Sequence, residues 1–357
     1  MKKLCFALLL LMSVAAKAQY VSLNDNEIQK LKELISKNAE AKAQYSEYIS
    51  TADAAVNVSP QPIDTIRSEG LLQGNPKKAA TANAIRDMRK MYALAICYRV
   101  EGEKSYLQNL TSYLTAWARI NTGRGDPIDD TNLDQAIEAY DLVKGKLKSN
   151  DNELIVKWLK QTADAELTTY KKAMNRETGS NNWNSHRLKI VGEIAYAIND
   201  DGYKKFIDEA LKKQLEKNLL TDGSSIDFKL RDALHYHVYD MEPLLKLAIV
   251  LKRATGVDEY AFVASNGASI KKSVEWVVPY VTGEKTHGEF VNSTVSFDLK
   301  RAQNGEAEYK AGTLWNPKNG YRTLALAAYF DTQYITTLKT IKPDYRDWQL
   351  VLNKVML

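Results

Sequence analysis

Cysteine is almost absent from this chain of 357 residues, which contains only Cys5 and Cys97. Cys5 lies in an N-terminal segment that we expect to be removed, without the leucine-rich, small-residue box that marks a lipid-modified cysteine. The mature chain then has one thiol, so no disulfide forms within it and a hydrophobic core must hold the fold. Cys97 lies in the apolar stretch MYALAICYRV, which favours a buried, unreactive thiol.

The chain also lacks the motifs that bind phosphates, zinc or nucleic acids. It has no glycine-rich phosphate loop, no zinc-type Cys/His spacing and no RNA-binding aromatic signature. Its formal net charge of +5 falls to +2 when three lysines leave with the N-terminal segment. A general basic field therefore does not argue for nucleic acid as a partner. The aspartates between Asp126 and Asp134 lack the spacing of a calcium loop, and we predict neither a metal nor a cofactor.

The N-terminus has the features of a secretory signal peptide. Two lysines precede an apolar run from Leu4 to Ala16, and the tripeptide AKA that ends at Ala18 has the form of a signal peptidase site. The run is short for a membrane span, and no later run replaces it. We therefore expect residues 1–18 to be removed, and the mature protein to be periplasmic or secreted with no membrane span.

Helical periodicity dominates the rest of the chain, and strand patterns are nearly absent. About ten amphipathic helices joined by short polar turns indicate successive helical hairpins. No linker or shift in composition divides them, so we expect one all-α domain over residues 19–357, such as a toroid of helical hairpins. The long polar segments at 57–80, 121–131, 175–185 and 282–319 would form one rim of its central cavity, where loops of this length are usually functional.

Three of the four histidines lie in two short segments that are rich in amides, arginine and tyrosine. The first, GSNNWNSHR at 179–187, supplies Asn181, Asn182 and His186 near the predicted start of a helix, which we expect Asn184 or Ser185 to cap. Side-chain amides beside the positive end of a helix suit a bound carboxylate. Trp183, in the same segment, could stack on a sugar ring.

The second segment is RDALHYHVYD, at 231–240. On a helix that begins near Leu234, His235 and Tyr239 share a face, whereas Tyr236 and His237 are turned away from it. This geometry leaves Tyr236 and Tyr239 as equal candidates for a reactive phenol. Arg231 is suited to bind an anion or to form an ordinary ion pair with a neighbouring acid. The fourth histidine, His287, stands alone in a predicted loop.

These residues resemble a known group of enzymes. An Asn-Asn loop before a helix, followed about fifty residues later by ALHYHVY, resembles the alginate lyase superfamily of polysaccharide lyase family 5, and still more the related family 38 of uronate-polymer lyases. The resemblance covers most of the mature chain and includes the stretches GNPKKAATANAIRDMRKMYALAICYRV, GDPI, AYDL and HGEFV.

The resemblance implies an incomplete (α/α) toroid and cleavage of anionic polysaccharides by β-elimination. It also implies that Asn182 or Asn181 and Arg231 neutralise a uronate carboxylate, while His186 and Tyr239 transfer protons. The chain departs from the family 5 pattern in two places, because Trp183 directly follows the second asparagine and Asp232 directly precedes Ala233. His235 and His237 therefore remain alternatives for the histidine role. We assign Asn181, Trp183, Tyr236, His235, His237 and His287 to substrate binding.

Two other functions are compatible with the sequence. A helical-toroid glycoside hydrolase would need two opposed carboxylates, for which Asp227, Asp232 and Asp240 are candidates. A non-catalytic glycan-binding protein would need none of the proton-transfer groups. The sequence indicates neither which polyuronate is cut, among polymannuronate, polyguluronate and glucuronan, nor an oligomeric state.

Overall fold

The computed structural model describes residues 19–357, which contain seventeen α-helices, four short 3₁₀-helices and one two-stranded antiparallel sheet. The all-α prediction is therefore confirmed. The predicted signal peptide, residues 1–18, lies outside the described residues. Within residues 19–357, no helix is long and apolar enough to cross a membrane.

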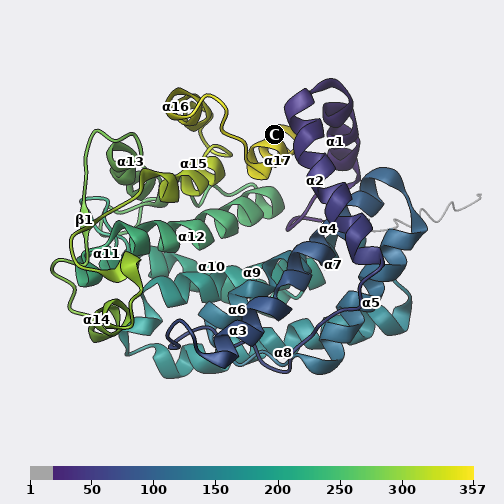
Figure 1. Ribbon diagram of the computed structural model, residues 1–357, viewed down its shortest axis with the longest axis horizontal. Helices are drawn as coiled ribbons and strands as arrows, with labels where there is room; N and C mark the ends of the chain where they lie inside the picture. Colours follow the sequence, from purple (N-terminus) through teal and green to yellow (C-terminus); the bar gives the residue numbers. More distant parts are fainter. Residues whose placement is uncertain (1–18) are drawn as a thin grey trace, which may run out of the picture.

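Five helices that follow one another around the molecule form an inner layer (Figure 1). Each packs against the next, in the order α4, α7, α9, α12 and α15. Their bounds are Arg86–Glu101, Asp134–Val143, Asn182–Ile198, Leu234–Thr255 and Tyr321–Ala327. Almost every side chain of α9 is buried, so this helix lies at the centre of the core.

Outer helices pack against the inner ones, as the hairpin prediction requires. Helices α2 and α5 cover α4, α8 and α10 cover α9, α13 covers α12, and α16 covers α15. These helices are amphipathic, and they bury one face. Their bounds are Ala39–Val56, Lys104–Ile120, Ser149–Ala173, Asp201–Asn218, Ile270–Val281 and Gln333–Ile341.

The first and last helices of the described chain meet. Helix α1 (Asp25–Lys37) packs against α17 (Trp348–Met356), and Figure 1 shows the C-terminus beside α1 and α2. Val21 and Met356 line the same small cavity. The ring of helices is thus closed by the two ends of the chain.

The long polar segments contain short elements that the sequence did not predict. Residues 282–319 contain a two-stranded sheet, one short α-helix and two 3₁₀-helices, and residues 121–131 contain α6. The bounds are α3 Pro76–Ala84, α6 Pro127–Asp130, η1 Thr131–Leu133, η2 Glu177–Gly179, α11 Ile226–Arg231, β1 Gly288–Glu289, α14 Ser296–Gln303, η3 Ala307–Tyr309, β2 Thr313–Leu314 and η4 Pro317–Gly320.

Candidate active site

A pocket of about 220 Å³ lies where α9 and α12 begin. It is lined by Glu69, Ile128, Asn182, Trp183, Arg231, His235, Tyr236, Tyr239, Arg301 and Tyr309. A second pocket of about 260 Å³ shares His235 and Tyr309 with it, so the two pockets adjoin. A wider groove on the outer helix α8 has no histidine, arginine or tyrosine in its lining. The chemistry-bearing side chains therefore converge on the smaller pocket.

The two asparagines at the start of α9 have different positions. Asn181, not Asn184 or Ser185, caps the helix, and its side chain accepts a hydrogen bond from the amide of Trp183 at 3.0 Å. The helix therefore begins three residues earlier than the sequence predicts. Asn182 lines the pocket, and both its backbone amide and its side-chain Nδ2 donate to the buried carboxylate of Asp227. Asp227 thus fixes the orientation of the Asn182 amide.

Asn184 and Ser185 contribute to the core instead of capping. The Nδ2 of Asn184 donates to Gln214 at 2.7 Å, and Gln214 also donates to the hydroxyl of Ser185 at 2.9 Å. Both residues are almost fully buried. The first turn of α9 is therefore joined to α10 by side-chain hydrogen bonds, which the capping prediction missed.

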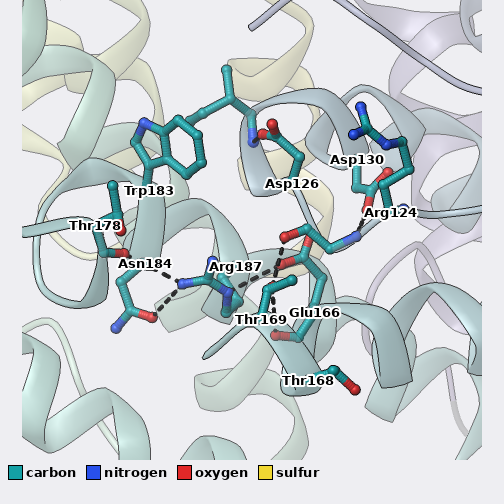
Figure 2. Close-up of polar contacts among 12 residues, drawn as sticks. Arg124, Asp126, Asp130, Glu166, Thr168, Thr169, Thr178, Trp183, Asn184 and Arg187 are labelled. Atoms are coloured by element: carbon teal, nitrogen blue, oxygen red, sulfur yellow. Dashed lines mark hydrogen bonds and ion pairs between the residues drawn. The ribbon is translucent and has the colours of Figure 1, made fainter. Parts of the chain in front are cut away.

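A buried cluster of charged side chains lies beneath the start of α9 (Figure 2). Arg187 Nε donates to Glu166 Oε2 at 3.1 Å, and its Nη1 donates to Asn184 Oδ1 at 3.2 Å. Asp130 Oδ2 accepts from the amides of Gly125 and Arg124 at 2.9 and 3.1 Å. These contacts tie α6, α8 and α9 together below Trp183, at the base of the pocket.

Burial raises the pKa of the Asp130 carboxyl to about 7, although hydrogen bonds from Glu166 and from backbone amides oppose the rise. Burial, followed by the charge of Asp130, also raises the pKa of Glu166 well above its ordinary value. Two carboxyl groups this close do not both ionise near neutral pH, so the pair retains a proton.

The turn between α11 and α12 is held by the segment that contains β1. Asp232 adopts a left-handed conformation with φ of 48°, and its carbonyl accepts from the amide of Phe290 at 2.8 Å. Its carboxylate accepts from the backbone and side chain of Asn292, both at 2.9 Å. Glu289 accepts from the amides of Leu234 and His235, at 2.7 and 3.0 Å, and so caps α12 from another segment.

Two arginines border the pocket near Tyr236. Arg231 forms an ion pair with Asp298, with 2.5 Å between Nη1 and Oδ1, and its guanidinium lies 3.9 Å from the ring centroid of Tyr236. Arg301 Nη1 donates to the hydroxyl of Tyr236 at 2.6 Å. The phenol of Tyr236 is therefore already engaged. Arg231 both forms the ordinary ion pair and lines the pocket.

Tyr239 is a second phenol of the pocket, beside Tyr236 and Tyr309, and within residues 19–357 its hydroxyl has no hydrogen-bond partner. Burial raises its pKa above the ordinary value, so the group is a neutral phenol in the empty pocket. The ring of His186 packs against it, with 4.3 Å between the ring centroids. Burial, followed by the charge of Lys189, lowers the pKa of His186 to about 3.

The other three histidines differ in position. His235 lines both pockets, and burial, with the charges of Arg301 and Arg231, lowers its pKa to about 4. His237 lies in the core, within 3.2 Å of the Ser225 hydroxyl and 3.1 Å of the Ser273 carbonyl, and does not line the pocket. His287 binds the Asp232 carbonyl at 2.9 Å and supports the α11–α12 turn from outside the pocket. The structure therefore gives His237 and His287 no direct access to a ligand in the pocket.

Four lining residues were not predicted from the sequence: Glu69, Ile128, Arg301 and Tyr309. Arg301 and Tyr309 come from the 282–319 segment, which was predicted to be functional only as a whole. Glu69 is the one carboxylate in the lining of the smaller pocket, and Glu289 and Glu308 line the adjoining one. The acids that the sequence suggested for a glycoside hydrolase, Asp227, Asp232 and Asp240, line neither pocket. The described residues contain no cluster of acids, histidines and cysteines that could hold a metal.

The fold resembles those of several solved structures. Similar solved structures include an alginate lyase from Bacteroides ovatus, with a TM-score of 0.69, 18% identity, and coverage of 92% of this chain and 96% of that one. Alginate lyase A1-III from Sphingomonas species A1 has a TM-score of 0.56 at 19% identity, covering 75% of this chain and 80% of that one. A variant of A1-III complexed with a tetrasaccharide has a TM-score of 0.60 at 17% identity, covering 88% of each chain.

At these identities the structural likeness shows the fold, and it confirms the (α/α) toroid. No curated protein matches the chain. The family model described as alginate lyase matches residues 29–287, which is well over half of the sequence. The chain therefore belongs to the alginate lyase family of polysaccharide lyases.

Proposed function

We propose that this protein cleaves 4-linked polyuronates by β-elimination, and that Tyr239 carries the proton transfers. The observation that supports this most directly is the convergence of Asn182, Arg231 and the unpartnered phenol of Tyr239 on one pocket. An amide, a guanidinium and a phenol are the groups that this elimination needs. Binding without catalysis would not call for the phenol.

The first requirement is to make the C5 proton of the uronate acidic. Asn182 and Arg231 bind the substrate carboxylate, and their hydrogen bonds strengthen as negative charge moves onto its oxygens in the enolate-like transition state. Both groups are already oriented, Asn182 by Asp227 and Arg231 by Asp298. Little reorganisation is then needed at the moment of reaction.

The elimination itself moves one proton and two electron pairs, since the electrons of the C4–O4 bond leave with O4. The phenolate of Tyr239 takes the proton from C5, the C–H electrons form the C4–C5 double bond, and the C4–O4 bond breaks. The phenol then returns the proton to the leaving oxygen O4, which restores the phenolate.

One phenol can serve both steps only where H5 and O4 lie on the same face of the sugar ring. Mannuronate and glucuronate have this geometry, whereas guluronate, the C5 epimer of mannuronate, places the two groups on opposite faces. Cleavage of guluronate would need a second group, such as His186 as the base. We therefore propose polymannuronate or glucuronan as the substrate.

The test is ultraviolet absorbance of the unsaturated uronate product, with the purified mature protein incubated separately with polymannuronate, polyguluronate and glucuronan. We expect absorbance to rise with polymannuronate or glucuronan and to stay level with polyguluronate. New reducing ends without absorbance would replace the lyase by a hydrolase. Binding without either product would leave a glycan-binding protein.

We also propose that the protein is exported and acts in the periplasm or outside the cell, on the evidence of the N-terminal sequence. The mass of the protein recovered from its native host should correspond to a chain that begins at Gln19. An intact N-terminus on the active protein would contradict this proposal.

A further inference from the structure

A chain of polar side chains leads from His186 away from the pocket and into the core. His186 Nδ1 lies 3.1 Å from the hydroxyl oxygen of Thr131, which begins η1. The same oxygen lies 2.5 Å from the Nζ of Lys189, one turn after His186 on α9. Lys189 Nζ also lies 2.5 Å from Asp134 Oδ2, and Lys246 Nζ donates to that oxygen at 3.1 Å.

The direction of these hydrogen bonds follows from the groups themselves. An ammonium group only donates, so the Thr131 oxygen accepts from Lys189. Thr131 has one hydroxyl proton and no partner in residues 19–357 other than Lys189 and His186. That proton is satisfied only by donation to His186 Nδ1, which must then be the unprotonated nitrogen. The neutral imidazole carries its proton on Nε2.

The Tyr239 carbonyl offers an acceptor beside the same imidazole. Pro243 lies inside α12 and has no amide proton, so this carbonyl, four residues earlier, lacks its usual helical donor. It lies close enough to His186 to raise the pKa of the imidazole. The buried Nε2 has no hydrogen-bond partner among the described residues. The assignment of the proton to Nε2 therefore rests on Thr131, and the carbonyl, which only accepts, does not oppose it.

The charges around His186 disfavour a second proton on the ring. They come from three helices: Lys189 on α9, Asp134 on α7, and Lys246 on α12. Both lysines oppose a cationic imidazole, whereas Asp134 favours it. Asp134 is bound by both lysines, so its charge is largely compensated.

We propose that Thr131 and Lys189 are positioning residues: they hold His186 as a neutral imidazole protonated on Nε2, so that His186 orients Tyr239 and does not accept the C5 proton. This inference rests on the proposed function. It assigns roles to two residues outside the pocket lining, and it leaves Tyr239 as the base.

The tautomer can be measured without turnover, by nitrogen-15 NMR of the protein labelled at histidine, with the His186 signals assigned from a His186→Asn variant. We expect a protonated Nε2 and an unprotonated Nδ1 in the wild type and in Thr131→Ser. Thr131→Val, which removes only the hydroxyl, should yield a mixture of tautomers. Lys189→Met should raise the pKa of His186. A protonated Nδ1 in the wild type would overturn the inference.

Kinetics supply the second readout. We expect Thr131→Val to lower kcat by roughly tenfold or more with KM nearly unchanged, a loss typical of removing a group that orients a reacting residue. Thr131→Ser should restore the rate. Thr115→Val is a matched control, because the buried Thr115 hydroxyl bonds only backbone carbonyls of α5. Unchanged kcat in Thr131→Val would also overturn the inference.

The two proposals fail in different ways. Absence of absorbance from the wild type on every polyuronate overturns the proposed function, while the NMR measurement on the same protein still decides the tautomer. Elimination with His186 protonated on Nδ1 upholds the function and overturns the inference.

Discussion

The two walls of the pocket are built differently. The α9 wall contains Asn182 and, one turn further along the helix, His186. Both side chains are almost fully buried and form hydrogen bonds to other residues. The opposite wall presents Arg301 and Tyr309 from the 282–319 segment, where the arginine stacks 4.7 Å from the tyrosine ring. Helix α14 has only eight residues, and its Leu299 is exposed. One wall is therefore held by hydrogen bonds to the core, and the other comes from a short helix near the surface.

The largest effect should come from Tyr239→Phe, which removes the unpartnered hydroxyl between the two walls. We expect kcat to fall by about 10²- to 10⁴-fold with the fold intact, because general acid–base catalysis is lost. Absorbance kinetics and the thermal midpoint measure the two parts of this prediction. Tyr236→Phe is the matched control, and it should lose far less because its hydroxyl already binds Arg301. A greater loss in Tyr236→Phe would reverse the assignment of the phenol.

Removing the side-chain amide of Asn182 from the α9 wall should have the next largest effect. We expect Asn182→Ala to lower kcat by about 10²- to 10³-fold, as for other preorganised donors to a developing oxyanion. The substitution also removes the side-chain donor to the Asp227 carboxylate, which keeps the backbone amide of residue 182, so the thermal midpoint must be recorded beside the kinetics. Asn181→Ala is the control, since it removes a cap and should chiefly lower stability.

The pH profile of kcat/KM can separate the two proton-transfer groups. Below its raised pKa, the phenolate fraction of Tyr239 grows about tenfold per pH unit, so activity should climb steadily between roughly pH 5 and pH 8. If His186, with its pKa lowered to about 3, were the base, the profile would be flat across that range. A level profile in the wild type would therefore favour the histidine.

On the opposite wall, which the 282–319 segment forms, a conservative change should act mainly on substrate binding. Arg301→Lys keeps the charge but loses the hydrogen bond to Tyr236 and the stacking on Tyr309, each worth about 1 kcal/mol. We expect KM to rise by roughly fivefold, with a smaller change in kcat. Initial rates over a range of oligosaccharide concentrations measure both. A fall in kcat with KM unchanged would mean that this wall, too, sets the reaction geometry.

The smallest effect concerns the stability of the α9 wall. The pKa of Asp130 is raised in the fold, so the native state binds more protons than the unfolded chain between about pH 4 and pH 7. The stability that this proton supplies is present at the acidic end of the window and is lost as the pH rises through it. Asp130→Asn should flatten this dependence, shifting the thermal midpoint at neutral pH by a few degrees. Asp344→Asn, on the surface, should leave it unchanged.

Local patterns in the sequence were enough for the class of fold and for part of the site. The helical periodicity reports which faces are buried, and it correctly predicted the hairpins. Amides, arginine and tyrosine gathered in two segments also led to Asn182, Arg231 and Tyr239, which the structure brings to one pocket.

Contacts between distant segments could not be predicted in the same way. His237 and His235 have the same kinds of neighbours in the sequence, yet two steps of about 100° each along α12 carry His237 into the core. Asn184 and Ser185 look like caps because nothing local reveals their partner Gln214 on α10. Arg301 reaches Tyr236 across 65 positions of sequence, and no periodicity records such a pairing.

The meeting of α1 and α17 has a consequence for how the protein acquires its structure. Residues at positions 21 and 356 line one cavity, so this part of the core requires almost the whole chain. Contacts so far apart in sequence form late, because their loop entropy must first be offset by local structure. The hairpins in the middle of the chain can form from local contacts, but the contact between α1 and α17 forms only when both segments are present.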